Sequence, residues 1–251
     1  MLNLAISIIA TLVAFVLGAL MGHWAYGFAP AVLVLVLTYF LLARRTSNKL
    51  QVAMEAANKA AMAASSRAQA LGRPPKLDEA RKILDDARHL GRWQFLLEAQ
   101  IEAQLGALDY VMRDFKAARV HLEKSFSRNW MAQGMLAAID FREGQVDAGV
   151  KRLEKVSLFA RKEASYWGLY AYILAESKRQ DQALEVLGRA LKILPENEAL
   201  KALQQAISNR KKLKMKEFGN SWFTFFPEQV PVRRVAQQAV QQGRGYPMPR
   251  R

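Results

Sequence analysis

The chain has 251 residues, no cysteine, and 37 basic against 22 acidic side chains, which gives a formal net charge of +15. The absence of cysteine excludes a disulfide framework, thiolate metal sites and cysteine nucleophiles. Residues 1–43 contain no Lys, Arg, Asp or Glu, so every charged side chain falls in the rest of the chain. This separation argues against an entirely soluble protein.

Two uncharged segments at the start of the chain predict a transmembrane hairpin within residues 1–45. The first, residues 2–21, is long enough at about 1.5 Å per residue to cross a hydrocarbon core of roughly 30 Å. The second, residues 28–43, is shorter, but Trp24 and Tyr26 suit the membrane interface and lengthen it. A cleaved signal peptide is the alternative for the first segment, which lacks the basic start that such a peptide needs.

The positions of the basic residues predict the orientation of this hairpin. The short turn between the two segments has no Lys or Arg, whereas Arg44, Arg45 and Lys49 follow the second segment. Basic residues close to the ends of membrane spans favour the cytoplasmic side. We therefore expect a multi-pass protein of a bacterial-type cytoplasmic (inner) membrane, with the N-terminus and the charged portion in the cytoplasm.

Small side chains recur every four residues in the first segment, at Ala10, Ala14, Gly18 and Gly22. A strip of this kind lets two helices approach closely. It predicts either packing against the second segment of the same hairpin or homo-oligomerisation through Gly18 and Gly22.

Residues 46–75 are expected to form a helical linker that extends the second span. The segment is rich in alanine and other strong helix formers as far as residue 71, and a Gly-Arg-Pro-Pro sequence then interrupts it. Its alanine face either docks on the first unit of the following domain or pairs with another copy of the chain.

From residue 76 onward the apolar residues recur at steps of three and four, which predicts an all-α class. A small residue, a Leu four positions later and usually another small residue three positions further occur four times, starting 38, 31 and 34 residues apart. The four sets are Ala80, Leu84 and Ala87; Ala118, Leu122 and Ser125; Gly149, Leu153 and Val156; and Ala183, Leu187 and Ala190. Matching pairs on a preceding helix are Leu105-Gly106, Leu136-Ala137 and Tyr170-Ala171. These registers predict stacked pairs of antiparallel helices.

This repeat resembles the tetratricopeptide (TPR) family. The best unit covers residues 164–197 and carries the motif residues Trp167, Tyr170-Ala171, Leu174, Ala183, Leu187, Ala190 and Pro195. The resemblance implies a short TPR-like α-solenoid of about three to four helix pairs within residues 76–217, with a capping helix at its end and a concave groove for a protein partner. The layout is similar to that of membrane-anchored TPR proteins with two N-terminal transmembrane helices. The candidate groove residues, taken from the first helices of the units, are Gln104, Gln133, Trp167 and Tyr170.

The excess of positive charge flanks the repeat body. Residues 44–76 carry seven basic and one acidic side chain, residues 77–208 carry 20 and 19, and residues 209–251 carry ten and two. A repeat protein that binds nucleic acid is expected to place its basic residues along the repeats. Nucleic acid is therefore not the favoured partner.

The C-terminal tail, residues 218–251, is aromatic and basic and is expected to be partly disordered. Just before it, Lys211, Lys212 and Lys214 lead into an aromatic cluster of Trp222, Phe223, Phe225 and Phe226. Three interpretations stay open for the four aromatic residues. They cover the last apolar helix of the stack, insert at an anionic lipid surface beside the basic residues, or form a linear motif for a partner protein or RNA.

The sequence contains none of the common catalytic motifs, such as a P-loop, a nucleophile elbow or a zinc-binding HExxH. His23, His89 and His121 are far apart and show no ligand spacing. We therefore predict no catalytic residue, no cofactor and no metal. The leading hypothesis is a non-catalytic membrane scaffold whose groove binds a protein partner. The alternatives are nucleic-acid or anionic-lipid binding through the basic tail, and an accessory or assembly subunit of a membrane enzyme complex.

Overall fold

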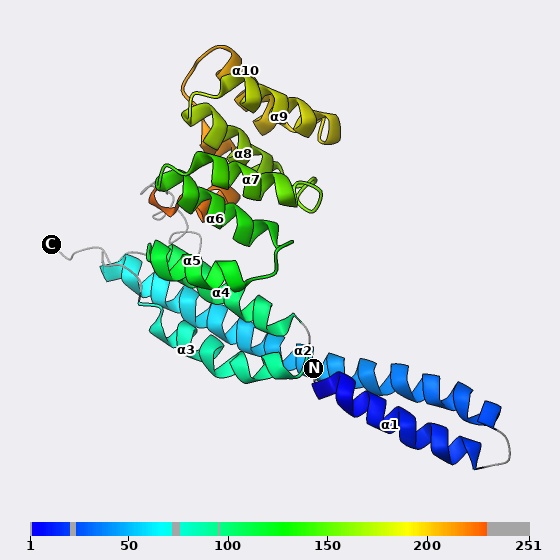
Figure 1. The fold of residues 1–251 in the computed structure, drawn as a ribbon. Helices are drawn as coiled ribbons and strands as arrows, with labels where there is room; N and C mark the ends of the chain where they lie inside the picture. The colour runs from blue at the N-terminus through cyan, green and yellow to red at the C-terminus, as the bar shows by residue number, and fades with distance from the viewer. Residues whose placement is uncertain (1, 21–23, 72–75, 95, 230–251) are drawn as a thin grey trace. The chain divides into compact units, whose positions relative to one another are not determined.

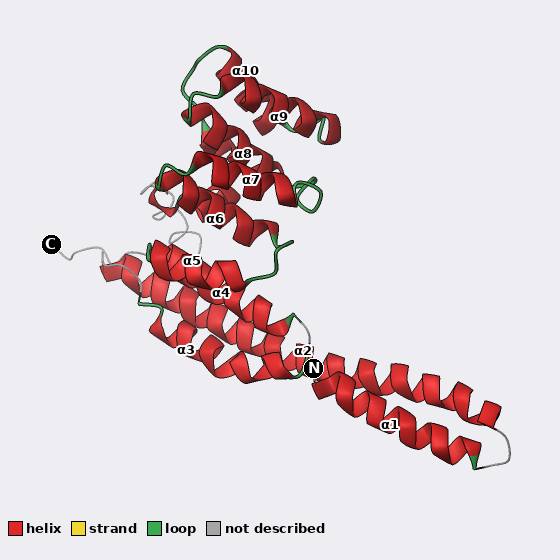
Figure 2. Ribbon diagram, in the orientation of Figure 1, coloured by secondary structure: helices red, strands yellow, loops and turns green. Residues whose placement is uncertain are grey.

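The computed structural model describes residues 2–20, 24–71, 76–94 and 96–229. All regular elements within these ranges are helices, so the all-α prediction is confirmed (Figure 2). The chain divides into two compact units. The first unit comprises residues 1–112 with 124–126, and the second comprises residues 113–123 with 127–251.

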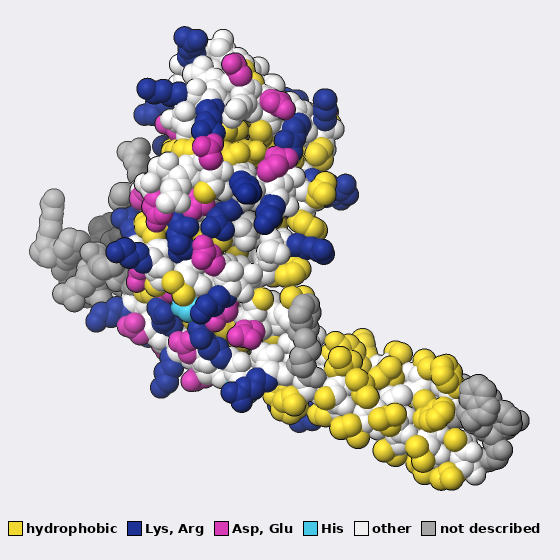
Figure 3. All heavy atoms as spheres, in the orientation of Figure 1, with side chains coloured by type: hydrophobic (Ala, Val, Ile, Leu, Met, Phe, Trp, Pro, Cys, Tyr) yellow, Lys and Arg dark blue, Asp and Glu magenta, His cyan; other side chains and the backbone are white. Residues whose placement is uncertain are grey.

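The first unit begins with a hairpin of two apolar helices, α1 (Leu2–Ala19) and α2 (Trp24–Leu71), which lie side by side (Figure 1). Both contain a stretch that is long and apolar enough to cross a membrane, by length and composition. Large apolar side chains cover the outside of this hairpin (Figure 3), including Ile9, Leu17 and Leu33, whose exposed fractions are 62%, 60% and 65%. An apolar surface of this extent requires a partner other than water, and lipid acyl chains would satisfy it.

The inner face of α1 carries polar side chains at the start of the helix and small side chains further along it. Asn3 and Ser7 are buried, and the Asn3 side-chain amide donates a 3.1 Å hydrogen bond to Thr46 Oγ1 on α2. The backbone N–H of Asn3 donates to the carbonyl oxygen of Trp93. Gly18 of the small-residue strip is half-buried, as expected if the strip packs on α2. Homo-oligomerisation through Gly18 and Gly22 stays a prediction, because residue 22 lies outside the described residues.

Helix α2 is continuous for 48 residues, and its second half joins a helical core. It packs there against α3 (Asp78–Asp86), the 3₁₀ helix η1 (Ala87–Arg92) and, through the shared core, α4 (Leu97–Val111). Leu50 and Ala57 of α2 are buried among Leu84, Leu90 and Ile101. The alanine face of the expected linker therefore docks on the helices that follow it, and a single helix joins the apolar hairpin to this core.

The second unit contains α5 (Phe115–Lys124) up to residue 123 and then helices joined by short turns: α6 (Trp130–Arg142), α7 (Val146–Val156), α8 (Ala164–Glu176), α9 (Gln180–Ile193) and α10 (Glu198–Ser208). Helices α6 and α7 form one antiparallel pair, α8 and α9 form the next, and α10 packs on α8 and α9 (Figure 1). Asn129 and Asn197 begin α6 and α10, since their side chains accept hydrogen bonds from the backbone N–H three residues later.

The small residues of the repeat pattern mark the closest helix contacts within these pairs. A Cβ added at Gly149 of α7 would lie 3.1 Å from the backbone oxygen of Ala137 on α6. Ala183 and Leu187 of α9 are fully buried. The small residues of the pattern therefore lie where one helix backbone approaches another.

After α10 the chain returns to the first helices of the two pairs. Residues Met215–Gln229, which we call the C-terminal strap, comprise η2 (Met215–Phe218), α11 (Asn220–Phe225) and η3 (Pro227–Gln229). Helix α11 packs on α6 and α8, and η2 packs on α8 and α10. The strap thus covers a face formed by α6 and α8.

Candidate functional site

The face of α6 and α8 under the strap has two glycines that make room for aromatic rings. A Cβ added at Gly134 of α6 would lie 2.6 Å from Cε1 of Phe225, and one added at Gly168 of α8 would lie 2.7 Å from Cε1 and Cζ of Phe218. Both distances are well below normal van der Waals contact, so any larger side chain would displace a ring. The two glycines are 34 residues apart and form successive ring-sized recesses.

Aromatic side chains of the strap pack around Tyr172 of α8. Its ring meets Trp222 edge-on at 4.9 Å and Phe226 edge-on at 5.2 Å between ring centroids. Trp222 and Phe226 stack on each other at 4.6 Å. Burial raises the pKa of the Tyr172 hydroxyl. Edge-to-face and stacked pairs of this kind add to the stabilisation from apolar burial.

Arg142, at the end of α6, forms polar contacts with the strap. Its guanidinium donates to the backbone oxygen of Phe225 at 2.9 Å and to the carboxylate of Glu228 at 2.8 Å. The same guanidinium lies over the rings of Phe115 and Phe226, with its carbon 4.6 Å and 4.8 Å from the ring centroids. One cation therefore recognises a carbonyl, a carboxylate and an aromatic face together.

Three of the four predicted tail aromatics are buried under this arrangement. Trp222, Phe225 and Phe226 are at most 3% exposed, and Phe223 is half-buried. They cover the first helices of two pairs, rather than the last helix of the stack that the capping interpretation named. In this conformation the three buried rings cannot contact lipid.

Lys211, Lys212 and Lys214 lie in the exposed stretch between α10 and η2. They line a pocket of about 220 Å³ together with Gln205 of α10, Asn209 at the C-cap of that helix, and Glu217. The structure therefore separates the three lysines from the aromatic residues that follow them in the sequence. The tail beyond residue 229 lies outside the described residues.

Two of the predicted groove residues pack between helices on the other side of α8. The Trp167 indole N–H donates to the backbone oxygen of Arg161, and the Tyr170 hydroxyl donates to Glu154 on α7 at 3.0 Å. Burial raises the pKa of Tyr170. A ligand on the strap-covered face would meet Gly168 and Tyr172 instead. Gln133 on α6 is half-buried, and Gln104 lies on α4 in the first unit.

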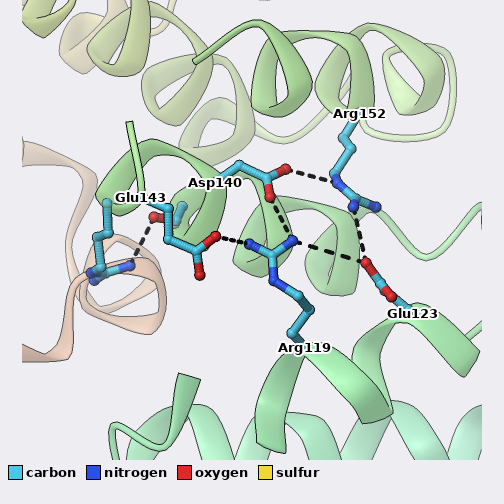
Figure 4. Close-up of polar contacts among 7 residues, drawn as sticks. Arg119, Glu123, Asp140, Glu143 and Arg152 are labelled. Carbon is cyan, nitrogen blue, oxygen red and sulfur yellow. Dashed lines mark hydrogen bonds and ion pairs between the residues drawn. The ribbon is translucent and has the colours of Figure 1, made fainter. Parts of the chain in front are cut away.

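A buried ion cluster holds α5, α6 and α7 together beside this face (Figure 4). The Asp140 carboxylate is fully buried; Arg119 donates to its Oδ1 at 2.7 Å and Arg152 to its Oδ2 at 2.8 Å. Glu143 and Glu123 add outer contacts to the two arginines at 2.7 Å and 3.1 Å. Burial alone would lower the pKa of Arg119, but the hydrogen bond and charge of Asp140, together with the charges of Glu143 and Glu123, outweigh it and raise that pKa. Both oxygens of the buried acid are satisfied by cations, which suits a structural role.

The described part of the chain contains no group of three or more His, Cys, Asp or Glu side chains placed to hold a metal ion. Comparison of the chain with protein-family models, curated proteins and solved structures finds no match. The candidate site is a face of α6 and α8 that holds an aromatic segment of the same chain.

Glu154→Gln is expected to lower stability at neutral pH and to lose this effect in acid. The hydrogen bond from Arg189 lowers the pKa of Glu154, so the pair stabilises the fold above the unfolded-state pKa of about 4.3 and fades as pH falls through the lower folded-state value. Because the carboxylate is half-exposed, we expect a loss below about 1 kcal/mol in the free energy of unfolding at pH 7. Urea titrations at pH 7 and pH 3 check this; an equal difference at both pH values contradicts it.

Proposed function

We propose that this chain is a membrane-anchored, TPR-like helical scaffold that binds a short aromatic segment of a protein partner on the face of α6 and α8. The observation that carries the proposal is that this face already holds such a segment, the C-terminal strap. Its two glycine recesses, Tyr172 and Arg142 form a specific set of contacts for a peptide. The proposed role is non-catalytic binding.

The TPR-like assignment rests on the helix pairs and on the spacing of their contacts. Two successive antiparallel pairs, α6–α7 and α8–α9, carry the small residues of the repeat at their closest approach. The recesses at Gly134 and Gly168 recur with the 34-residue spacing of the best repeat unit. These features favour a short α-solenoid whose first helices line the binding face.

Membrane anchoring is supported by the apolar hairpin and by the continuity of α2. The helix leaves the apolar hairpin and becomes part of the first unit's core, so the body of this unit is held by a helix rather than by a flexible linker. Arg44 and Arg45 follow the apolar stretch, which favours a cytoplasmic position for everything that comes after it. We therefore place the proposed scaffold at the cytoplasmic face of a bacterial-type inner membrane.

The chemistry of the strap defines the partner segment that this face would accept. Phe218 and Phe225 enter the two recesses and are seven residues apart, and Glu228 follows three residues after the second ring. A partner segment is thus expected to present two aromatic side chains from two short helical turns, followed by a carboxylate for Arg142. In the full-length chain it competes with the strap.

A peptide titration in reconstituted lipid discs tests this proposal. We expect a fluorescent peptide of residues 215–229 to bind saturably to a chain that ends at residue 214. The full-length chain should bind it at least about tenfold more weakly, because its tethered strap acts at an effective concentration in the millimolar range. Replacement of Arg142 with alanine in the shortened chain should weaken binding, whereas Arg179→Ala, at an exposed ion pair elsewhere, should not.

Absence of peptide binding to a shortened chain that keeps its helical circular dichroism would contradict the proposal. If the shortened chain does not fold, the full-length Glu228→Ala variant takes its place. This variant loses the Arg142 ion pair, and its weakened strap should admit the peptide more readily than the natural strap does. Equal binding by the variant and the natural chain would then contradict the proposal.

A further inference from the structure

The ends of α7 and α9 form an exposed edge of the second unit, away from the strap. The Glu154 carboxylate on α7 and the Arg189 guanidinium on α9 are 2.8 Å apart, so an ion pair links the two helices near their ends. Leu158 and Ile193 follow four residues after the two members of this pair. Leu158 is 77% exposed, and Phe159 beside it is 50% exposed.

The loop that carries these apolar side chains is ordered by buried contacts. Ala160 is fully buried, and its backbone N–H donates to the Val156 oxygen at 3.0 Å. The Trp167 indole N–H donates to the Arg161 oxygen in the same loop. Leu158 and Phe159 are therefore held outward by the fold, although apolar burial would favour turning them inward.

Basic side chains surround the exposed apolar residues. Lys155, Arg161 and Lys162 are exposed in or just before the loop, together with two acidic side chains, Glu163 and Glu154, the second of which is paired with Arg189. The Arg128 guanidinium carbon lies 5.2 Å from the centroid of the Phe159 ring. Figure 3 shows apolar side chains together with Lys and Arg along the edge where the α7–α8 loop and the end of α9 lie.

We propose that this edge is a contact surface for an anionic lipid bilayer. Leu158, Phe159 and Ile193 enter the interfacial region, while Lys155, Arg161 and Lys162 lie among the headgroup phosphates. Apolar residues rimmed by Lys and Arg are typical of interfacial membrane contacts. Protein interfaces, in contrast, are depleted in Lys. Long Lys and Arg stems also allow the charges to reach the phosphates while the apolar side chains insert.

This surface is separate from the peptide-binding face, and the proposal does not depend on it. It also differs from the tail interpretation, which assigned lipid contact to aromatic residues that the structure buries. The lipid contact proposed here is at the end of α7, outside the C-terminal aromatic cluster.

The natural absence of cysteine permits a direct test in the full-length chain. We would label Leu158→Cys with an environment-sensitive fluorophore and reconstitute the protein into phosphatidylcholine vesicles with about 30% phosphatidylglycerol and brominated acyl chains. The matched control is Gln182→Cys, an exposed position in the first turn of α9, at the opposite end of that helix. Circular dichroism checks that both variants keep their helices.

We expect bromine quenching to be about twofold or more stronger at position 158 than at position 182. The excess should fall when phosphatidylglycerol is omitted and when salt is raised, because both changes weaken attraction to the basic residues. It should also disappear in the Arg161→Glu, Lys162→Glu background. Equal quenching at the two positions would overturn the proposal. So would a blue shift at position 158 without bromine quenching, which would indicate a protein contact.

Discussion

Replacement of Asp140 with alanine is expected to lower the free energy of unfolding by about 3 kcal/mol, in the range measured for breaking buried ion pairs. The carboxylate is fully buried, and each of its oxygens accepts from one arginine. Its removal leaves the Arg119 and Arg152 guanidinium groups close together without the anion between them. Because these two side chains are 23% and 28% exposed, water compensates only part of the loss.

Urea unfolding in detergent, followed by circular dichroism, measures this effect. The matched control is Asp147→Ala, which removes a carboxylate that also pairs with an arginine but is 84% exposed. Exposed ion pairs contribute little, so we expect no measurable change for this control. Similar losses for the two variants would show that the buried cluster does not hold α5, α6 and α7 together.

Alanine at both Gly134 and Gly168 is expected to release the C-terminal strap. Each new Cβ would lie less than 3 Å from a ring of the strap, and Phe225 is fully buried, so its ring has little room to move. Overpacking of this kind costs about 1 to 3 kcal/mol per site. The gain of about 1 kcal/mol in helix propensity on replacing a glycine offsets part of that cost.

Chymotryptic cleavage after Trp222 and Phe225 measures how often the strap opens. Every 1.4 kcal/mol lost from the strap contact should raise the cleavage rate about tenfold, when opening is fast compared with cleavage. Gly188→Ala on α9 is the control, because a Cβ there has no neighbouring atom within 4 Å. It should leave cleavage unchanged. Unchanged cleavage in the double variant would mean that the recesses do not hold the rings.

The helical fold of the second unit could be predicted because its pattern is local. Small residues and leucines at steps of three and four residues determine helix faces, and their recurrence determines the pairing of consecutive helices. Leu122, Leu153 and Leu187 are all fully buried, as the repeat pattern requires. The extension of α2 as a helix followed in the same way from its alanine-rich sequence.

The strap could not be placed from the sequence because its contacts are long-range. Arg142 and Glu228 are 86 positions apart, and nothing in the periodicity of either segment links them. The 34-residue spacing of Gly134 and Gly168 was the available signal, but small residues are frequent on every helix of the repeat. Which of these small residues contacts an aromatic ring depends on how the C-terminal strap packs on α6 and α8.

The buried acid was missed for a different reason. Asp140 lies 34 residues before Leu174, at the place where the best repeat unit has an apolar core residue. Acidic residues on amphipathic helices are usually solvated, and only the two arginines from α5 and α7 make this position tolerable in a core. Their convergence on one carboxylate depends on how the helices pack.

A charge-swap titration tests most directly whether the face of α6 and α8 recognises a peptide through the contacts seen with the strap. The chain ending at residue 214 would carry Arg142→Glu, and the peptide of residues 215–229 would carry Glu228→Arg. We expect each single change to weaken binding about tenfold or more, and the two together to bind more tightly than either single change, since the ion pair is re-formed with reversed sign while the contacts of Arg142 with the Phe225 carbonyl and the Phe226 ring stay lost. Equal binding in all four combinations would contradict recognition at this face.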